Sequence, residues 1–236
     1  MDDKIRDAQQ KILKIFSKYH GTFALSGGTA LELYYLHHRF SKDLDFFSPE
    51  YSVVEIEELV SKIEDETGEN VTLESEFKTA GYARVRFYSM PVKGTDIPLK
   101  IDFVEDVIIR KPNVMLFDGV PAYDVENIYV QKIAAVSGTV LIEDITGREI
   151  STGRREVRDA FDIYMLSKKI RPLHEFLLQL SREQQRGLIQ WHHSFSRQDL
   201  KIGLLDLDIY DAEFDASEML NHIDDEINKF VEGVLE

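Results

Sequence analysis

The chain has no cysteine among its 236 residues, which excludes disulfide bonds and thiolate metal ligands. It also lacks an apolar N-terminal segment and any stretch of about 18 apolar residues, which argues against secretion and against a membrane span. No internal repeat or low-complexity linker is visible. We therefore expect a cytoplasmic globular protein that does not associate with a membrane.

Positive charge is scarce, with 28 Lys and Arg against 43 Asp and Glu and a formal net charge of −15. This balance argues against nucleic-acid binding, because phosphate contacts dominate that affinity. The acids are concentrated at the end, however, where residues 206–236 hold eleven acids and one lysine. The rest is nearly balanced and can carry a local basic surface. Residues 148–171 are the best candidate for it, with a solvated helix face as the equal alternative.

The stretch Phe23–Phe47 organises the rest of the chain, because it combines a glycine turn with two carboxylates. A short apolar run ends at residues 26–28, Ser-Gly-Gly, and paired glycines let the backbone turn sharply and approach a ligand. Residues 29–37 then have the apolar spacing of a helix. Asp43 and Asp45 follow in a predicted strand, on one face and about 7 Å apart at their Cα atoms.

Two carboxylates on one face repel each other and lose solvation when they are half-buried. A divalent cation removes both problems, and Mg²⁺ is typically held by one or two carboxylates together with substrate phosphate oxygens. Backbone N–H groups at the start of a helix suit an anion. The glycine turn and the two acids therefore predict one site for a metal-bound triphosphate, although a plain β-turn-α-β unit with solvated acids is the simpler alternative.

Two strings within this stretch carry a family resemblance. They are G-G-T-A-L at residues 27–31 and H-R-F-S-K-D-L-D-F-F at residues 38–47. Together they resemble the nucleotidyltransferase AbiEii/AbiGii toxin family, a branch of the DNA polymerase β-like nucleotidyltransferase superfamily. The glycine pair followed by D-x-D is moderately specific, and the full string is highly specific.

The resemblance implies an enzyme that uses Mg²⁺ or Mn²⁺ and takes an NTP as substrate. It implies a nucleotide-binding group and a group of acids that hold the metal. The nucleotide-binding residues would be Ser26, Gly27, Gly28, Thr29 and Lys132, the metal ligands Asp43, Asp45 and Asp102, and the catalytic residues Asp43, Asp45, Asp102, Lys132 and Asp159.

The residues around Asp102 fit such a role without requiring it. Asp102 lies in the predicted strand 99–104, whose apolar residues alternate with polar ones. The superfamily uses a third carboxylate on a neighbouring strand, so the resemblance implies that Asp102 completes the metal site or accepts the proton of the attacking hydroxyl. Glu105 and Asp106 are nearby alternatives, and an ordinary surface acid is another.

Lys132 lies within an apolar line, with Ile128 and Val136 at i−4 and i+4 of a predicted helix over 125–137. A lysine in such a line either extends to water or pairs with an anion. The resemblance favours an anion and implies that Lys132 contacts the triphosphate.

The predicted helix that opens at Arg154 resembles the family's last motif, which places an aspartate, here Asp159, near the active lysine. A surface ion pair between Arg158 and Asp162 is the simpler interpretation of this helix.

The second strand of a predicted hairpin, 71–77 with 82–90, has one basic and aromatic face. Ala83, Val85 and Phe87 would be core, and the residues between them would meet phosphate, stack a base or be solvated.

The remaining predicted elements are helices, short strands and one loop. A helix is expected over 2–20, a second helix opens with a capping box of Ser52 with Glu55 and runs to about 67, and further helices follow Pro172, with a capping box of Ser181 with Gln184. Strands are expected over 107–109 and 114–117, and a loop over 141–153.

We expect an α/β (α+β) fold, with a nucleotidyltransferase-like mixed sheet flanked by helices over residues 1–122 and a helical domain over 123–236. The expected reaction moves an NMP from an NTP to an acceptor hydroxyl, with RNA or tRNA as the acceptor, in the toxin of an abortive-infection or toxin–antitoxin pair. A cognate antitoxin would be its partner. The alternatives are transfer to a small molecule such as an aminoglycoside, and a non-catalytic nucleotide-binding or partner-binding module.

Overall fold

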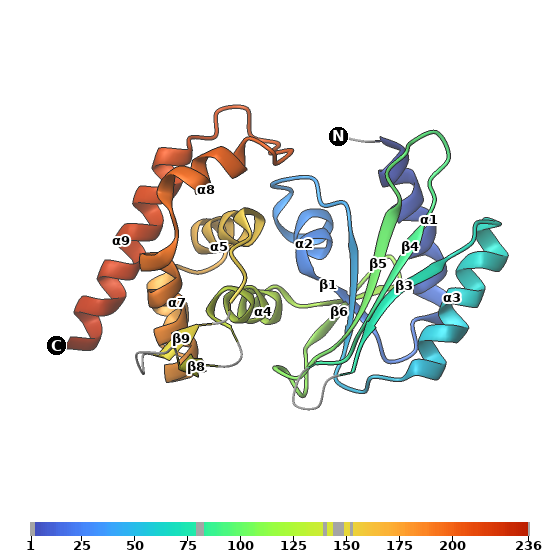
Figure 1. Ribbon diagram of the computed structural model, residues 1–236, viewed down its shortest axis with the longest axis horizontal. Helices are drawn as coiled ribbons and strands as arrows, with labels where there is room; N and C mark the ends of the chain where they lie inside the picture. The colour runs from blue at the N-terminus through green and yellow to red at the C-terminus, as the bar shows by residue number, and fades with distance from the viewer. Residues whose placement is uncertain (1–2, 79–82, 139–140, 144–148, 152, 236) are drawn as a thin grey trace. The chain divides into compact units, whose positions relative to one another are not determined.

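The structure, a computed structural model, describes residues 3–78, 83–138, 141–143, 149–151 and 153–235. It divides the chain into two compact units (Figure 1). The first unit comprises Met1–Tyr35 and Phe40–Asn127, and the second comprises Leu36–Arg39 and Ile128–Glu236. None of the described helices is both long enough and apolar enough to span a membrane.

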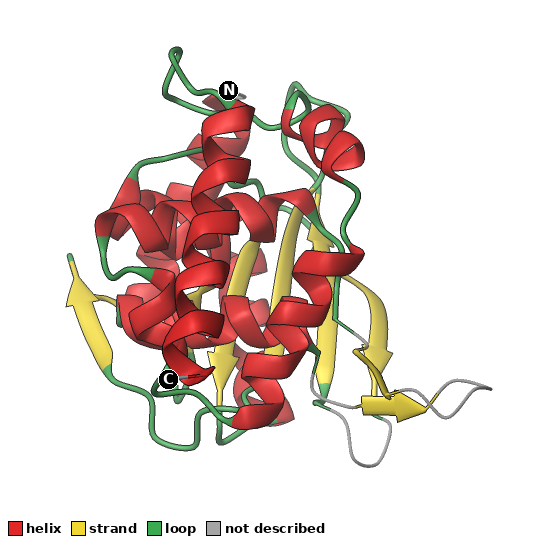
Figure 2. Ribbon diagram, turned by 90° about the vertical axis from the view of Figure 1, so that its left-hand side faces the viewer, coloured by secondary structure: helices red, strands yellow, loops and turns green. Residues whose placement is uncertain are grey.

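The first unit is built on one mixed sheet, whose strands are yellow in Figure 2. The strand order is β3-β4-β5-β2-β1-β7-β6, in which β1–β7 and β2–β5 are parallel and the other neighbours are antiparallel. This mixed α/β architecture confirms the predicted fold class. The strands are β1 (Ala24–Ser26), β2 (Leu44–Ser48), β3 (Thr72–Phe77), β4 (Val85–Met90), β5 (Leu99–Glu105), β6 (Val114–Phe117) and β7 (Val120–Tyr123).

Two helices, α1 (Asp3–Tyr19) and α3 (Val53–Thr67), pack beside each other on the apolar face of this sheet (Figure 1). Alternation along β2 turns Leu44 and Phe46 to this face, where both are fully buried. The ring of Phe16 from α1 stacks on Phe46 with centroids 4.0 Å apart. The residues between them on β2 therefore point to the opposite, partly open face.

The start of α3 corrects one prediction. Ser52 caps the helix by accepting a hydrogen bond from the Glu55 N–H at 3.3 Å, but Glu55 does not return the bond. Its carboxylate instead accepts from the N–H and the hydroxyl of Thr22, at 2.9 and 2.8 Å. The capping box is therefore half formed, because a tertiary partner competes for the glutamate. Gly68, in the left-handed conformation, ends α3.

The helix after β1 begins earlier than predicted and has an irregular end. It consists of α2 (Gly27–Ala30) and a π-helical segment, η1 (Leu31–Leu36), so the two glycines form its first turn. His37 lies outside the helix, with φ at +46°. π-Helical turns are rare in proteins, and those that occur are often found at functional sites.

The prediction for the faces of β4 is wrong. Arg86 and Tyr88 are buried, whereas Val85 and Phe87 are only half-buried. Arg86 forms ion pairs with Glu57 of α3 at 2.9 Å and with Glu76 of β3 at 2.7 Å. Arg86 and Tyr88 of this face are thus covered by a helix and cannot serve as a free phosphate or base surface.

The segment after β5 also differs from the prediction. Residues 107–109 form no strand, because the side chain of Asp106 accepts hydrogen bonds from the N–H groups of Ile108 and Ile109 and holds a turn. The following hairpin joins β6 to β7 through Asp118-Gly119, both with positive φ. An Asp-Gly pair is the typical signal of such a turn, and it was the cue that would have predicted β7.

The second unit is mainly helical. Its first helix, α4, is capped by Asp124, which accepts from the N–H of Asn127 at 2.7 Å, and ends at Gly138 with φ at +78°. The capping box of Ser181 with Gln184 is complete. The helices are α4 (Val125–Ser137), α5 (Val157–Lys169), α6 (Leu173–Leu177), α7 (Arg182–Ser194), α8 (Arg197–Leu204) and α9 (Ala216–Leu235), and the short strands β8 (Leu141–Glu143) and β9 (Glu149–Ser151) lie within the predicted loop.

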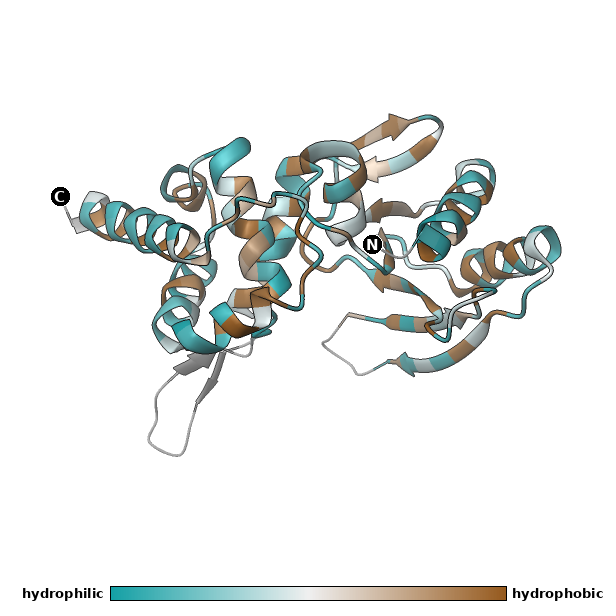
Figure 3. Cartoon of the chain, turned by 90° about the horizontal axis from the view of Figure 1, so that it is seen from above, coloured by the Kyte–Doolittle hydropathy of each residue, from teal (hydrophilic) through white to brown (hydrophobic). Residues whose placement is uncertain are grey.

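The last helix, α9, packs its apolar stripe inward, and its alternating apolar and polar turns are visible towards the marked C-terminus in Figure 3. Glu226 is the buried acid of this helix, with 3% of its surface exposed. Its carboxylate accepts hydrogen bonds from His174 at 2.7 Å and from Lys229 at 3.0 Å. Burial alone would raise the pKa of Glu226, but these hydrogen bonds dominate and lower the pKa to about 2.

A pH-dependent stability difference follows from this carboxylate. Because the pKa of Glu226 is lower in the folded state, its stabilisation is present above about pH 4.5 and is lost as the pH falls towards 2. We expect Glu226→Gln to lower the free energy of unfolding by about 1–3 kcal/mol at pH 7. That difference from the wild type should shrink between pH 5 and pH 3 in urea titrations.

The control is Glu232→Gln, a change at an exposed acid of the same helix, which should alter stability by less than about 0.5 kcal/mol at every pH. A difference for Glu226→Gln that stays constant down to pH 3 would contradict the assignment.

Candidate active site

The sheet aligns two of the predicted acids on its partly open face. Strands β2 and β5 are parallel, and their register pairs Asp45 with Asp102. Paired residues on neighbouring strands point to the same face, with the strands about 4.8 Å apart. Asp43 immediately precedes β2, and burial alternates from half-buried Asp43 through buried Leu44 to half-buried Asp45. The structure therefore pairs Asp45 with Asp102 on neighbouring strands and places Asp43 two residues before Asp45 in the chain.

The glycine turn lies directly against one of these acids. Strand β1 pairs Ser26 with Asp45, and the next residue, Gly27, has φ at +68°. A Cβ atom at Gly27 would lie 2.3 Å from the Asp45 Oδ2 atom, so the carboxylate occupies the space that any other side chain would need. This position requires glycine for both its backbone conformation and its close contact.

Thr29 connects the start of the helix to the same group. Its hydroxyl donates a hydrogen bond to the backbone carbonyl of Asp43. Ser26, Gly28 and Thr29 are all buried beside Gly27. The structure thus brings together the predicted nucleotide-binding residues of the turn and the acids Asp43 and Asp45.

The two alternatives to Asp102 have structural partners. Glu105 pairs with Arg84 at 2.8 Å, and the hydrogen bonds from Arg84 lower the pKa of Glu105. Asp106 holds the turn that follows β5. The strand register distinguishes Asp102, which is paired with Asp45, from Glu105, which is paired with Ser48.

This group of acids fits a hard cation that is shared with a nucleotide. Across the described residues, no three His, Asp or Glu side chains form a group that could hold a metal ion by themselves. Mg²⁺ in nucleotide sites needs only one or two carboxylates, because phosphates and water supply the other ligands. The absence of a side chain at Gly27 is what allows the Asp45 carboxylate to lie against the glycine turn, where a Cβ would displace it.

The other predicted group lies in the second unit. Lys132, on α4, is 7% exposed, and its Nζ atom lies 2.8 Å from the Asp159 Oδ1 atom on α5. The same Nζ atom lies 2.8 Å from the Asp162 Oδ2 atom. Burial alone would lower the pKa of Lys132, but the two carboxylates outweigh burial and raise it, so the lysine stays charged.

Asp162 has a role that the sequence did not reveal. The interpretation of Asp162 as one half of a surface ion pair with Arg158 is wrong, because Asp162 is fully buried and binds His38, Arg39 and Lys132. Burial alone would raise the pKa of Asp162, but the charges of Arg39 and Lys132 and the hydrogen bond from His38 hold it well below its usual range. The sequence signals were the position of Asp162 on the same side of its helix as Asp159 and the His38-Arg39 pair in the family string, which carried no predicted role.

The basic segment 148–171 is partly neutralised where the structure describes it. Arg154 lies 3.4 Å from Asp159, and Lys168 pairs with Glu218 at 2.8 Å. Residue 148 and the neighbouring residues 144–147 lie outside the described part, as does Tyr82 of the predicted hairpin face.

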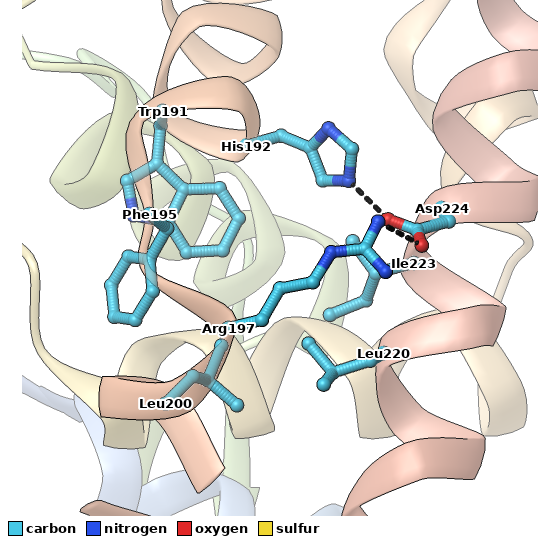
Figure 4. A pocket seen from close by; sticks show the side chains of 8 residues that line it. All are labelled: Trp191, His192, Phe195, Arg197, Leu200, Leu220, Ile223 and Asp224. Atoms are coloured by element: carbon cyan, nitrogen blue, oxygen red, sulfur yellow. Dashed lines mark hydrogen bonds and ion pairs between the residues drawn. The ribbon is translucent and has the colours of Figure 1, made fainter.

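A small recess on the second unit was not predicted (Figure 4). Its walls are mainly apolar, and Asp224 at its rim binds His192 at 2.7 Å and Arg197. Its cavity volume of about 20 Å³ accommodates roughly one or two water molecules. The lining residues are Trp191, His192, Phe195, Arg197, Leu200, Leu220, Ile223 and Asp224.

Comparisons with known proteins agree with this geometry. The model of the family described as "Nucleotidyl transferase AbiEii toxin, Type IV TA system" matches residues 11–236. A crystal structure of a candidate nucleotidyltransferase from H. pylori is 20% identical, with a TM-score of 0.57 and coverage of 98% of this chain and 96% of that chain. The crystal structure of JHP933 from Helicobacter pylori is 19% identical, with a TM-score of 0.56 and coverage of 99% and 96%. At this identity the two structures show the fold alone. No curated protein matches the chain significantly.

Two glycines with nearly the same backbone conformation allow a matched test of the turn. Gly27 and Gly68 have φ at +68° and +70°, but a Cβ at Gly68 would have no atom within 4 Å. We expect both Gly→Ala variants to lose about 1–2 kcal/mol of stability from backbone strain. Gly27→Ala should lose more, because its methyl group displaces the Asp45 carboxylate, and should reduce NTP binding at least about tenfold.

Urea titrations and NTP binding isotherms of the two variants measure these effects. Gly68→Ala should bind NTP as the wild type does. Equal effects of the two substitutions on binding would show that the contact between Gly27 and Asp45 has no part in the site.

Proposed function

We propose a function from the premise that this chain belongs to the AbiEii nucleotidyl transferase toxin family of type IV toxin–antitoxin systems and is a nucleotidyltransferase. In this proposal it transfers a nucleoside monophosphate from an NTP to a hydroxyl of RNA, with tRNA as the preferred acceptor. The observation that carries this proposal is the placement of the Asp45 carboxylate against Gly27, with Asp102 paired to Asp45 on the next strand. The family also implies an antitoxin as partner. A cytoplasmic location accords with an RNA acceptor and stays a prediction.

The reaction forms one bond and breaks one. The acceptor hydroxyl oxygen attacks the α-phosphorus of the NTP, the bond from that phosphorus to the β-phosphate oxygen breaks, and pyrophosphate leaves. Asp102, beside Asp45 on the next strand, would accept the proton of the attacking hydroxyl. Both partners must be held in line, and much of the acceleration comes from this positioning.

The glycine turn would hold the triphosphate. The backbone N–H groups of residues 26–29 offer donors to phosphate oxygens at a point where Gly27 lets the ligand approach the backbone closely. Such preorganised donors stabilise the charge that develops on the phosphates during transfer. The hydroxyl of Thr29 is used internally, on the Asp43 carbonyl, so its part would be to fix the turn.

One or two of the acids Asp43, Asp45 and Asp102 would hold Mg²⁺, or Mn²⁺ in its place, together with phosphate oxygens. When bound, the ion would supply positive charge to the phosphates and lower the pKa of an attacking oxygen. Three acids near a triphosphate carry a large negative charge, and the residues of the turn add none. A cation is therefore needed before the nucleotide can approach them.

Lys132 and Asp159 would supply the remaining charge and an acceptor. Lys132 adds a point charge to the triphosphate. The Asp159 Oδ2 atom is buried and has no hydrogen-bond partner among the described residues, so it can accept a bond from a ligand donor.

The role of Asp45 is tested by a change that keeps its shape. Asp45→Asn removes the charge, and we expect at least about a hundredfold loss of NMP transfer from labelled NTP to RNA, and loss of the response to added Mg²⁺. Asp96→Asn, at an exposed acid of the loop before β5, is the matched control and should leave transfer unchanged. Equal rates for the wild type and Asp45→Asn would reject the proposed metal site.

The acceptor is tested by presenting alternatives together. Purified protein with Mg²⁺ is incubated with each labelled NTP, total RNA and an aminoglycoside. Label on tRNA-sized RNA with release of pyrophosphate supports the proposal. Label on the drug alone would assign a small-molecule acceptor, and label on neither would overturn the proposed transfer.

A further inference from the structure

Asp162 is a buried carboxylate to which the proposed reaction gives no part. Its Oδ1 atom accepts hydrogen bonds from His38 Nε2 and from Arg39 Nε, both at 2.8 Å. Its Oδ2 atom accepts from Arg39 Nη2 at 2.8 Å and lies 2.8 Å from Lys132 Nζ. Both carboxylate oxygens therefore have two partners each, and the side chain has only one orientation that keeps them all.

Asp159, three residues earlier on the same face of α5, is bonded differently. One oxygen accepts from Lys132, and the other has no hydrogen-bond partner among the described residues, with the half-exposed Arg154 at 3.4 Å. Asp159 thus has acceptor capacity left for a ligand, whereas the two oxygens of Asp162 are occupied. The two aspartates share Lys132 and are otherwise distinct.

The carboxylate of Asp162 is fixed from outside its own helix. Arg39 binds it in a bidentate manner, which sets the plane of the carboxylate as well as its distance. Arg39 belongs to the segment Leu36–Arg39, which is part of the second unit. The backbone carbonyl of the neighbouring His38 accepts a hydrogen bond from the Tyr210 N–H at 3.1 Å. The family string H-R therefore has a physical role here, because it orients an acid on α5.

We propose that Asp162 is a positioning residue that, held by Arg39 and His38, fixes the ammonium group of Lys132 in the orientation that serves the nucleotide. This inference rests on the proposed function, in which Lys132 meets the triphosphate. Lysine is flexible over four carbons, so without a second anchor its ammonium group samples several positions. The carboxylates of Asp159 and Asp162 on α5 together restrict the ammonium group of Lys132 to one position.

The charges of the cluster give the consequence of removing Asp162. Arg39 and Lys132 are balanced by Asp159 and Asp162 in the buried network. Without the charge of Asp162, Arg39 loses its bidentate acceptor and Lys132 loses one of its two carboxylates, which is strongly destabilising. Lys132 is then displaced from its position, even where the fold survives.

The first test is Asp162→Asn. We expect the KM for NTP to rise about tenfold while the KM for the acceptor stays unchanged, because Lys132 acts on the triphosphate only. The matched control is Glu226→Gln, which also removes a buried carboxylate of the second unit but has no contact with Lys132. A loss of stability without any change in KM is expected for that control.

The second test separates positioning from stability, and it also applies if Asp162→Asn does not fold. The double variant Arg39→Gln with Asp162→Asn removes one cation and one anion, so the pair of Lys132 with Asp159 stays balanced. We expect it to regain stability relative to Asp162→Asn, with the KM for NTP still raised. Recovery of both stability and KM in the double variant would overturn the proposal, and so would a wild-type KM in a folded Asp162→Asn protein.

A third measurement is independent of activity. The Nζ protons of Lys132 are bonded within a buried network, so ¹H–¹⁵N spectra of the wild type should show a slowly exchanging lysine ammonium group. The signal should be lost in Asp162→Asn and kept in Glu226→Gln. If the wild type transfers no nucleotide, the proposed function fails; an unchanged signal in Asp162→Asn contradicts the positioning role.

Discussion

The contact between the Asp45 carboxylate and the backbone of Gly27 is the constraint on which the first unit depends. It requires a glycine with positive φ, a strand pair that sets Ser26 opposite Asp45, and an apolar face on the other side of β2 that fixes the alternation. Leu44 and Phe46 provide that face, since both are buried beneath α1 and α3. A shift of one residue in β2 would exchange the acids for these apolar side chains, so the packing of the core also determines which way the acids point.

The two units stabilise charge in opposite ways. Asp43, Asp45 and Asp102 are half-buried acids at adjoining positions of one sheet face, an arrangement that accumulates negative charge and favours a cation. The cluster around Asp162 is buried, and within it the cations Arg39 and Lys132 pair with the anions Asp159 and Asp162. A balanced buried cluster contributes little net stability but tolerates only one geometry, because breaking any pair leaves an uncompensated charge. Such rigidity suits a residue whose position must be kept.

The sequence predicted the features that depend on local spacing. The alternation of Asp43, Leu44 and Asp45 and the capped helix that carries Lys132 follow from periods of two or of 3.6 residues. The approach of Asp159 to that lysine was implied by the family resemblance, since no period joins residues on two different helices. The faces of β4 could not be predicted in this way, because both faces carry apolar and aromatic residues and the choice is made by Glu57 of a distant helix. The pairing of Arg39 with Asp162 joins residues 123 positions apart, and no local pattern encodes it. The prediction of the second half of the Ser52 capping box was wrong because of a similarly distant partner, since Thr22 binds the Glu55 carboxylate.

The charge distribution takes on a different meaning once the pairs are known. Part of the acidic end of the chain is used internally, since Glu218, Asp224 and Glu226 each bind a base of the same unit. The same contacts occupy Lys168 and Arg197, which the composition alone leaves available for phosphate. Exposed ion pairs of this kind contribute only about 0–1 kcal/mol to stability, so a phosphate group can displace the acid from its base. The displaced acid stays nearby, however, and repels the phosphate. For the proposed RNA acceptor, a broad electrostatic attraction is therefore the weaker mechanism. Recognition would instead rest on a short segment of RNA near the reacting hydroxyl.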